Sequence, residues 1–180
     1  MSDILALARE IGFEYSAGFN ASRLEFRAEV REMCAADRCG RFNKSWSCPP
    51  AIGSIEHLER MARLFSHGVL MQTVGALDGD FDAEGIAAAG ELHKRRFDTL
   101  SRQAKLLTGG ECLPMGAGSC TLCRECTYPA RPCRYPERVH PSMEACGLLV
   151  ADVCALAGLD YYRGPGSITY SACILMNQGG

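Results

Sequence analysis

Four cysteines lie close together in the stretch "SCTLCRECTYPARPC", and their spacing is typical of metal ligands. Cys120, Cys123 and Cys126 form a Cys-x2-Cys-x2-Cys pattern, and Cys133 follows after six further residues. A two-residue gap lets a tight turn direct two sulfurs toward one centre. Three such sulfurs can bind three corners of an iron–sulfur cubane, as they do in bacterial ferredoxins. The pattern therefore favours an iron–sulfur cluster.

Other chemistry is open to the same four thiols. Together they could hold one tetrahedral zinc ion. A zinc ribbon or a binuclear zinc–cysteine module needs a second Cys-x2-Cys pair, however, and the sequence has none elsewhere. A thioredoxin-like redox pair is disfavoured, because that motif opens a helix after a strand, whereas this stretch is a proline-rich loop.

A second group of cysteines lies near the N-terminus in "CAADRCGRFNKSWSCPP". Its spacing is Cys34-x4-Cys39-x8-Cys48, followed by two prolines. A proline after a ligating cysteine bends the chain away from the centre, and the bacterial ferredoxin pattern also ends in Cys-Pro. Trp46 could shield a metal centre from water and so tune its potential. These spacings alone also fit three half-buried thiols on a loop.

The ligand count leaves several arrangements open. One [4Fe–4S] cluster needs four ligands, and the two groups supply seven. In the simplest arrangement Cys133 completes the first site, and Cys112, Cys146 or His140 completes the second. Alternatively, Cys133 crosses to the N-terminal group, as in two-cluster ferredoxins, and Cys112 or Cys146 replaces it. A centre with three cysteines and one open iron is the third arrangement, and it could bind a substrate.

Both groups together resemble one known family. The stretches "RCGRFNKSWSCPP" and "GAGSCTLCRECTYPARPCRYPERVHPSMEACG", followed by a closing aromatic strand, are similar to the predicted metal-binding proteins of domain of unknown function 2284. The resemblance extends from about Cys34 to Met176. It implies metal binding but no established reaction. The ligands it implies are Cys34, Cys39, Cys48, Cys120, Cys123, Cys126 and Cys133.

Composition narrows the functional classes. The chain has 180 residues, a net charge of -2 and eleven cysteines. The charge gives no support for nucleic-acid or membrane-surface binding, and the odd cysteine count rules out complete internal pairing. No signal peptide is recognisable, and the longest largely apolar run, residues 147–159, is too short to cross a bilayer. We therefore expect a cytoplasmic protein whose thiols stay reduced.

The remaining segments must position these loops. We expect short helices near residues 24–34 and 55–65, the latter capped by Ser54, and a long helix over 83–107 capped by Asp82. His93 is placed on the basic face of that long helix. A buried strand is expected at 69–77, and Ser142 is expected to cap a third helix that continues to about Ala157.

The C-terminal part is interpreted as a hairpin. The stretches "LDYYRG" and "SITYSACILM" would pair around Pro165-Gly166, whereas "SAGFNAS" near the N-terminus is interpreted as a loop. Cys154 and Cys173 are expected in the core. The sequence thus predicts a single α+β metal-binding domain over residues 1–180. A small sheet would pack on two or three helices, with cysteine loops at 34–50 and 109–141.

We therefore expect an iron–sulfur protein that carries one or two [4Fe–4S] clusters and transfers electrons to a partner enzyme. One alternative is a structural or regulatory zinc module. Another is an enzyme that uses an open iron site on a small-molecule substrate. No Gly-x-Gly-x-x-Gly or P-loop pattern supports nucleotide binding.

Overall fold

The structure, a computed structural model, describes residues 1–79 and 82–177. It has the expected α+β class, with a four-stranded antiparallel sheet and five α-helices in the described residues. The helices are α1 (Ser2–Ile11), α2 (Ala28–Ala35), α3 (Ile55–Ala62), α4 (Ala83–Leu107) and α5 (Val150–Leu156). The strands are β1 (Tyr15–Asn20), β2 (His67–Ala76), β3 (Cys112–Met115) and β4 (Ser167–Met176). Short 3-10 helices cover Ala21–Arg23, Pro136–Arg138 and Glu144–Cys146.

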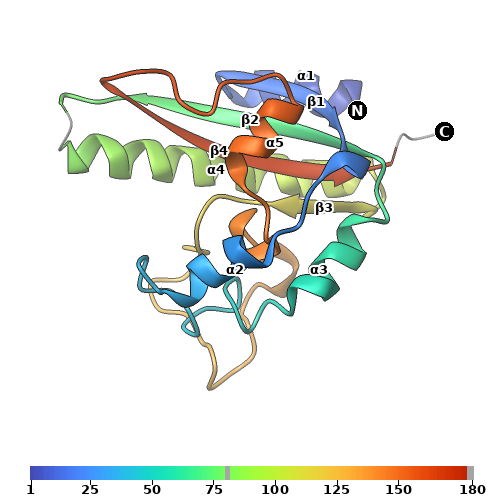
Figure 1. The fold of residues 1–180 in the computed structure, drawn as a ribbon, viewed down its shortest axis with the longest axis vertical. Helices are drawn as coiled ribbons and strands as arrows, with labels where there is room; N and C mark the ends of the chain where they lie inside the picture. Colours follow the sequence, from blue (N-terminus) through green and yellow to red (C-terminus); the bar gives the residue numbers. More distant parts are fainter. Residues whose placement is uncertain (80–81, 178–180) are drawn as a thin grey trace.

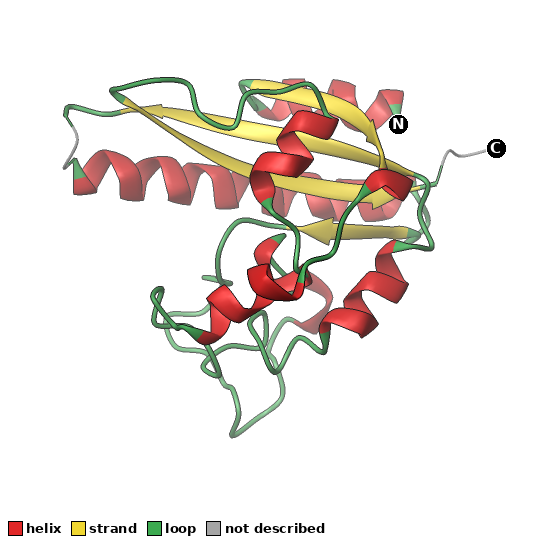
Figure 2. Cartoon of the chain, viewed as in Figure 1, coloured by secondary structure: helices red, strands yellow, loops and turns green. Residues whose placement is uncertain are grey.

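The sheet is built around its two longest strands (Figure 2). Its order is β1-β2-β4-β3, and every neighbouring pair is antiparallel. β2 and β4 pair along ten residues each, from His67 opposite Met176 to Ala76 opposite Ser167. The shorter β1 and β3 form the edges, so the long central pair provides the platform for the rest of the molecule.

Helices cover both faces of the sheet. Side chains along β2 and β4 point alternately to one face and to the other, so both faces carry apolar side chains. Val69 and Met71 point to the face covered by α1 and α4, where they pack with Phe97 and Leu100. Leu70 points to the opposite face and packs with residues of α3 and α5. Figure 1 shows the sheet between α4 and α5, with α2, α3 and the cysteine loops gathered beyond the β3 edge.

The helix starts follow the predicted caps. The Ser54 hydroxyl accepts the backbone N–H of His57, and the Asp82 carboxylate accepts that of Gly85. These bonds satisfy N–H groups that have no partner inside the helix. α4 then lies close to β2, where a Cβ on Gly75 would come within 2.5 Å of the Ala89 Cβ. The absence of a side chain at Gly75 permits this close packing.

Two local predictions are wrong. The expected helix over 142–157 is split into a 3-10 turn (Glu144–Cys146) and α5, because Gly147 adopts a left-handed conformation with φ 84°. The expected C-terminal hairpin does not form in the described residues. The stretch "LDYYRG" is irregular, and β4 pairs with β2 and β3 instead.

Three elements lie where the sequence pattern indicated none. β1 replaces the expected loop at "SAGFNAS", α1 precedes it, and β3 occupies the start of the expected 109–141 loop. His93 also differs from its prediction: it is fully buried against the sheet rather than on the basic face of α4. Its Nδ1 lies 3.0 Å from the Thr73 hydroxyl of β2.

Candidate metal centre

The two cysteine loops contact each other directly, although about 80 residues separate them in the sequence. The Trp46 indole N–H donates to the Arg131 carbonyl at 3.2 Å, and the Tyr128 hydroxyl hydrogen-bonds to the Asn43 side chain at 2.7 Å. The rings of Trp46 and Tyr128 also meet edge to face at 4.9 Å. In Figure 1 the loops lie side by side, away from the sheet. The fold therefore brings both cysteine groups into one region.

Cys120, Cys123, Cys126 and Cys133 line one small pocket, together with Trp46. We call them the 120–133 cysteines. The pocket has a volume of about 20 Å³ and is closed on one side by residues 45–47 of the N-terminal loop. Cys133 thus lies with the three cysteines that precede it. None of Cys34, Cys39 or Cys48 lines this pocket.

Several donors are directed at the sulfurs of this pocket. Burial alone would raise the pKa of Cys126. Backbone N–H groups of Tyr128 and Trp46 and the Ser45 hydroxyl counteract it and hold this pKa below its usual value. The backbone N–H of Tyr135 donates to the Cys133 sulfur at 3.4 Å. Such N–H···S bonds stabilise thiolates, the form of cysteine that binds metals.

The other three cysteines line a separate and larger pocket. We call Cys34, Cys39 and Cys48 the 34–48 cysteines. Their pocket has a volume of about 390 Å³, and its wall includes Glu144 and an apolar group formed by Met33, Ala36, Phe42 and Pro49. One carboxylate oxygen of Glu144, Oε2, is buried and has no hydrogen-bond partner in the described residues. This pocket therefore combines three thiols with an unsatisfied carboxylate.

The pKa shifts of these thiols differ in direction, even within the 120–133 group. Burial raises the pKa of Cys34, Cys48 and Cys120, whereas the pKa of Cys126 is lowered. All eleven cysteines lie in the described residues, and none forms a disulfide. A metal would therefore have to displace protons from the buried thiols on binding, which makes its affinity pH-dependent.

The additional ligand candidates lie outside both pockets. Cys112 belongs to β3, and Cys146 is fully buried in the hydrophobic core, where burial raises its pKa to about 12. His140 packs edge to face on Phe97 at 5.9 Å and lines a third cavity that also contacts Cys120. Burial lowers the pKa of His140 to about 4.

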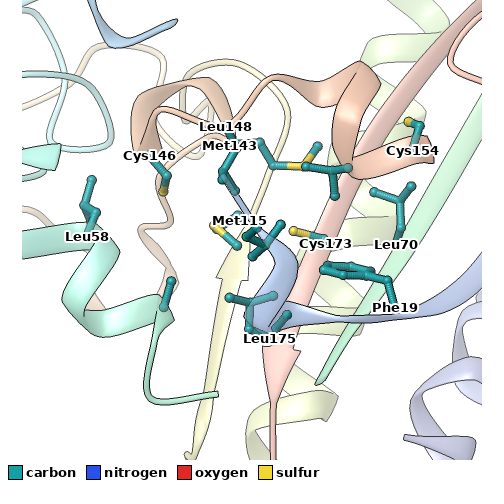
Figure 3. Packing of buried hydrophobic residues seen from close by; sticks show 14 residues of the cluster. Phe19, Leu58, Leu70, Met115, Met143, Cys146, Leu148, Cys154, Cys173 and Leu175 are labelled. Carbon is teal, nitrogen blue, oxygen red and sulfur yellow. The ribbon is translucent and has the colours of Figure 1, made fainter. Parts of the chain in front are cut away.

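Cys154 and Cys173 are core residues, as predicted. Both are fully buried and pack in the cluster that also contains Leu70, Met115 and Cys146 (Figure 3). Burial raises the pKa of both thiols, which keeps them neutral. Packing in the core therefore accounts for the presence of these two cysteines without a role in metal binding.

The sulfurs do not form a finished coordination shell. Across residues 1–79 and 82–177, no group of three or more His, Cys, Asp and Glu side chains is arranged to hold an ion as it stands. What the chain provides is thus a set of thiols around two pockets, with hydrogen-bond donors in place on one set. Binding a metal would require the sulfurs to move closer together.

Two buried serines connect the pockets, and sequence reasoning did not single them out. Ser45 and Ser47 are 4% and 1% exposed, and their hydroxyl oxygens lie 3.0 Å apart. Ser47 accepts the backbone N–H of Cys120 at 2.9 Å and lies 3.7 Å from the Cys48 sulfur. The sequence feature that could have identified them is their position on either side of Trp46, directly before Cys48-Pro49-Pro50.

The family comparison agrees with this arrangement. The model of a family described as "Predicted metal-binding protein (DUF2284)" matches residues 17–176, which include all seven cysteines of the two pockets. The chain belongs to this family. No curated protein and no solved structure is matched. DUF2284 membership thus supports metal binding and leaves the kind of metal open. Within the described part of the chain, no helix has the length and apolar character needed to span a membrane.

Proposed function

We propose that this DUF2284 protein binds an iron–sulfur cluster, of the [4Fe–4S] type, through the 120–133 cysteines and transfers electrons to a partner. The observation that carries the proposal is that these four sulfurs line one pocket, where the Tyr135 N–H donates to the Cys133 sulfur and neighbouring backbone N–H groups hold the pKa of Cys126 below its usual value. All-thiolate ligation with N–H···S bonds is characteristic of protein-bound clusters. When bound, the cluster supplies one-electron chemistry.

The chain's own residues would set the properties of that cluster. The hydrogen bond from Tyr135 and the N–H groups of Tyr128 and Trp46 near Cys126 would favour the more negatively charged, reduced state of the cluster, and the indole of Trp46 would limit access of water. Interaction with the nearby Cys123 sulfur raises the pKa of the Arg134 guanidinium, whose Nη1 donates to the Glu125 carbonyl at 3.0 Å. Positive charge next to the sulfurs compensates the charge of the thiolates.

An acidic protein surface fits as the redox partner. Arg124, Arg131 and Arg134 are exposed and belong to the same loop as the 120–133 cysteines. Complementary charge accelerates the encounter of two proteins and orients them. Docking at these arginines would bring a partner close to the cluster. We place this exchange in a reducing compartment such as the cytoplasm.

The 34–48 cysteines are proposed as a second centre. Their pocket offers three thiols in a volume of about 390 Å³. Thiolates bind iron and zinc. A centre with only three firm sulfur ligands would leave a position for a substrate.

Zinc at the 120–133 cysteines is the second candidate, and the size of their pocket favours it. A volume of about 20 Å³ accommodates roughly one water-sized sphere. One zinc ion fits such a space with small movements of the sulfurs, whereas a cubane requires the loop to open outward. A zinc site there would be structural or regulatory, because a closed tetrahedral site has no free position.

Metal analysis of protein purified without oxygen tests the proposal. An iron–sulfur protein should be brown, absorb broadly near about 400 nm, contain iron and acid-labile sulfide in equal amounts, and give an EPR signal on reduction. Cys123→Ser should remove the colour of the first centre, whereas Cys154→Ser, which alters a core thiol, should retain it. Colourless protein with stoichiometric zinc would refute the cluster and support the zinc site.

A further inference from the structure

A large cavity lies next to the cysteine loops, and the metal-binding proposal leaves it unused. It has a volume of about 850 Å³ and is lined by residues of α4 and β4 and by Ala117, Gly118, Thr121 and Leu122 of the loop. Thr121 and Leu122, which form part of its wall, separate Cys120 from Cys123. Glu144 lines both this cavity and the pocket of the 34–48 cysteines. A molecule in the cavity would thus lie beside both cysteine groups.

One cation in this cavity forms no ion pair among the described residues. Asp98 is occupied, because Arg138 donates to both of its carboxylate oxygens at 3.0 and 2.9 Å. Arg95 lies 3.7 Å from Glu91. Lys94 is half-buried, and no acidic group of the described residues forms an ion pair with it. Burial lowers the pKa of Lys94, which reflects the cost of holding an unpaired ammonium there.

Two further polar atoms in the same wall are unsatisfied. The Oε2 atom of Glu144 and the hydroxyl of Thr169 are buried and have no hydrogen-bond partner among the described residues. Leaving a buried polar atom without a hydrogen-bond partner is energetically unfavourable. An ammonium, a carboxylate oxygen and a hydroxyl without partners, all lining one cavity, are the features of a binding site for a polar small molecule.

We propose that this cavity binds a small organic anion that also carries a hydrogen-bond donor. Its anionic group pairs with the Lys94 ammonium, and its donor group, such as an ammonium or a hydroxyl, bonds to the Glu144 carboxylate. The Thr169 hydroxyl supplies a further hydrogen bond. The aromatic ring of Tyr170 provides apolar wall between these polar groups. This binding function goes beyond metal binding and does not depend on which metal the cysteines hold.

Lys94 could instead serve the metal centre, and the experiment must distinguish that role from the binding of an anion. Cys120 lies close enough to raise the pKa of Lys94, although burial has the larger and opposite effect. The ammonium could therefore serve only to balance the charge of a metal centre at the 120–133 cysteines. In that case Lys94→Gln would change the redox potential or metal retention and leave the binding of small anions unaffected.

Calorimetric titration of the metal-loaded, full-length protein tests the proposal at constant ionic strength with three probes: L-glutamate, succinate and inorganic phosphate. We expect saturable binding of at least one probe with a Kd of about 1 mM or tighter. Among the carboxylates, glutamate should bind more tightly than succinate, because only glutamate brings a donor for Glu144. Phosphate as the tightest ligand would identify phosphate as the anionic group.

Variants then assign the contacts. Lys94→Gln should weaken binding at least tenfold, and Lys94→Arg should restore most of it because it keeps the charge. Lys105→Gln is the matched control. Lys105 belongs to the same helix but bonds to the Glu137 carbonyl outside the cavity, so affinity should not change. Glu144→Gln should reduce the affinity for glutamate toward that for succinate.

Three results would overturn the proposal. The first is the absence of saturable binding for all three anions. The second is a folded Lys94→Gln variant that binds them as the wild type does. The third is a Lys94→Gln variant with a changed midpoint potential and unchanged affinity, which would assign Lys94 to the metal centre. The first two outcomes are measured as heat rather than colour, so they are independent of whether iron or zinc is found.

Discussion

The Ser47 hydroxyl accepts the backbone N–H of Cys120 at 2.9 Å and so joins the two cysteine loops across 73 residues of sequence. The same hydroxyl lies 3.7 Å from the Cys48 sulfur, so one buried side chain contacts a member of each cysteine group. A hydrogen bond of this kind fixes the backbone that carries a ligand, and loss of such support commonly weakens metal binding. Ser47 is therefore expected to couple the two pockets.

Replacing Ser47 by alanine tests this coupling. Ser47→Ala leaves the backbone N–H of Cys120 without its partner, so we expect metal retention under chelator challenge to fall about 10–100-fold. Metal content after timed exposure to a chelator measures the effect. Ser101→Ala is the control, because Ser101 is also fully buried and hydrogen-bonded but lies on α4. Equal metal loss in both variants would show that Ser47 has no specific role.

The position of Cys133 predicts which site this residue serves. Because Cys133 lines the pocket of Cys120, Cys123 and Cys126, Cys133→Ser should reduce metal content as Cys123→Ser does. Cys34→Ser, in the other pocket, should leave this centre intact. Metal-to-protein ratios and the absorption spectrum measure both effects. A Cys133→Ser spectrum that matches that of Cys34→Ser would instead place Cys133 with the N-terminal group.

Trp46 provides an internal probe of the metal, because it is the single tryptophan of the chain. Its ring lies in the wall of the 120–133 pocket and contacts Tyr128. A bound iron–sulfur cluster absorbs in the range of tryptophan emission and should quench it strongly, whereas zinc, which has a filled d shell, should not. Fluorescence should therefore increase when a chelator removes iron. Unchanged emission on removal of the metal would contradict a cluster in this pocket.

The sequence predicted those features that depend on local chemistry. Ser54 and Asp82 begin their helices as expected, because an N-cap is a bond between neighbouring residues. The α+β class and the core positions of Cys154 and Cys173 were also predicted. The cysteine pattern gave the candidate ligands. It left open which of the two sites Cys133 belongs to, and the position of Cys133 in the pocket bears on that question.

The features that were missed depend on contacts between distant residues. The edge strand β1 contains Gly18 and polar residues, and it becomes a strand only because β2 pairs with it. The helix predicted over 142–157 is interrupted at Gly147, whose carbonyl accepts the N–H of Arg27 at 2.8 Å. His93 was placed on the wrong face because three cationic residues follow it in the sequence. The periodicity of apolar residues in the sequence does not reveal which distant residues will contact each other.

Gly147 should be intolerant of a side chain. Its φ of 84° disfavours any L-residue by about 1–2 kcal/mol, and a Cβ would come within 2.4 Å of the Ile55 side chain and 3.0 Å of the Arg27 carbonyl. Overpacking of that kind adds about 1–3 kcal/mol. We therefore expect Gly147→Ala to lower the free energy of unfolding by about 2–5 kcal/mol, as measured by urea denaturation.

Gly109→Ala separates the two contributions. Gly109 also has a positive φ, 62°, but a Cβ there would have no heavy atom within 4 Å. This control should therefore lose only the conformational part, about 1–2 kcal/mol. Equal losses in the two variants would show that the contact with Ile55 and Arg27 adds nothing.

His93 makes the stability of the fold depend on pH. Its ring is fully buried beside Thr73, and burial lowers the pKa of His93 to about 3. Between this value and the ordinary pKa of about 6.5, the unfolded chain binds a proton that the folded chain excludes. The contribution of His93 to stability is thus complete above about pH 6.5 and is lost as the pH falls. Between pH 7 and pH 5 the free energy of unfolding should decrease by about 2 kcal/mol from this group.

Urea denaturation of the His93→Gln variant at pH 7 and pH 5 measures that contribution. Glutamine has no proton to gain, so the decrease between the two pH values should be smaller than in the wild type by about 2 kcal/mol, even if the variant is less stable at both. His140, whose pKa burial also lowers, should account for a further part of the decrease. An identical pH dependence in wild type and His93→Gln would mean that the buried ring carries its proton in the folded state.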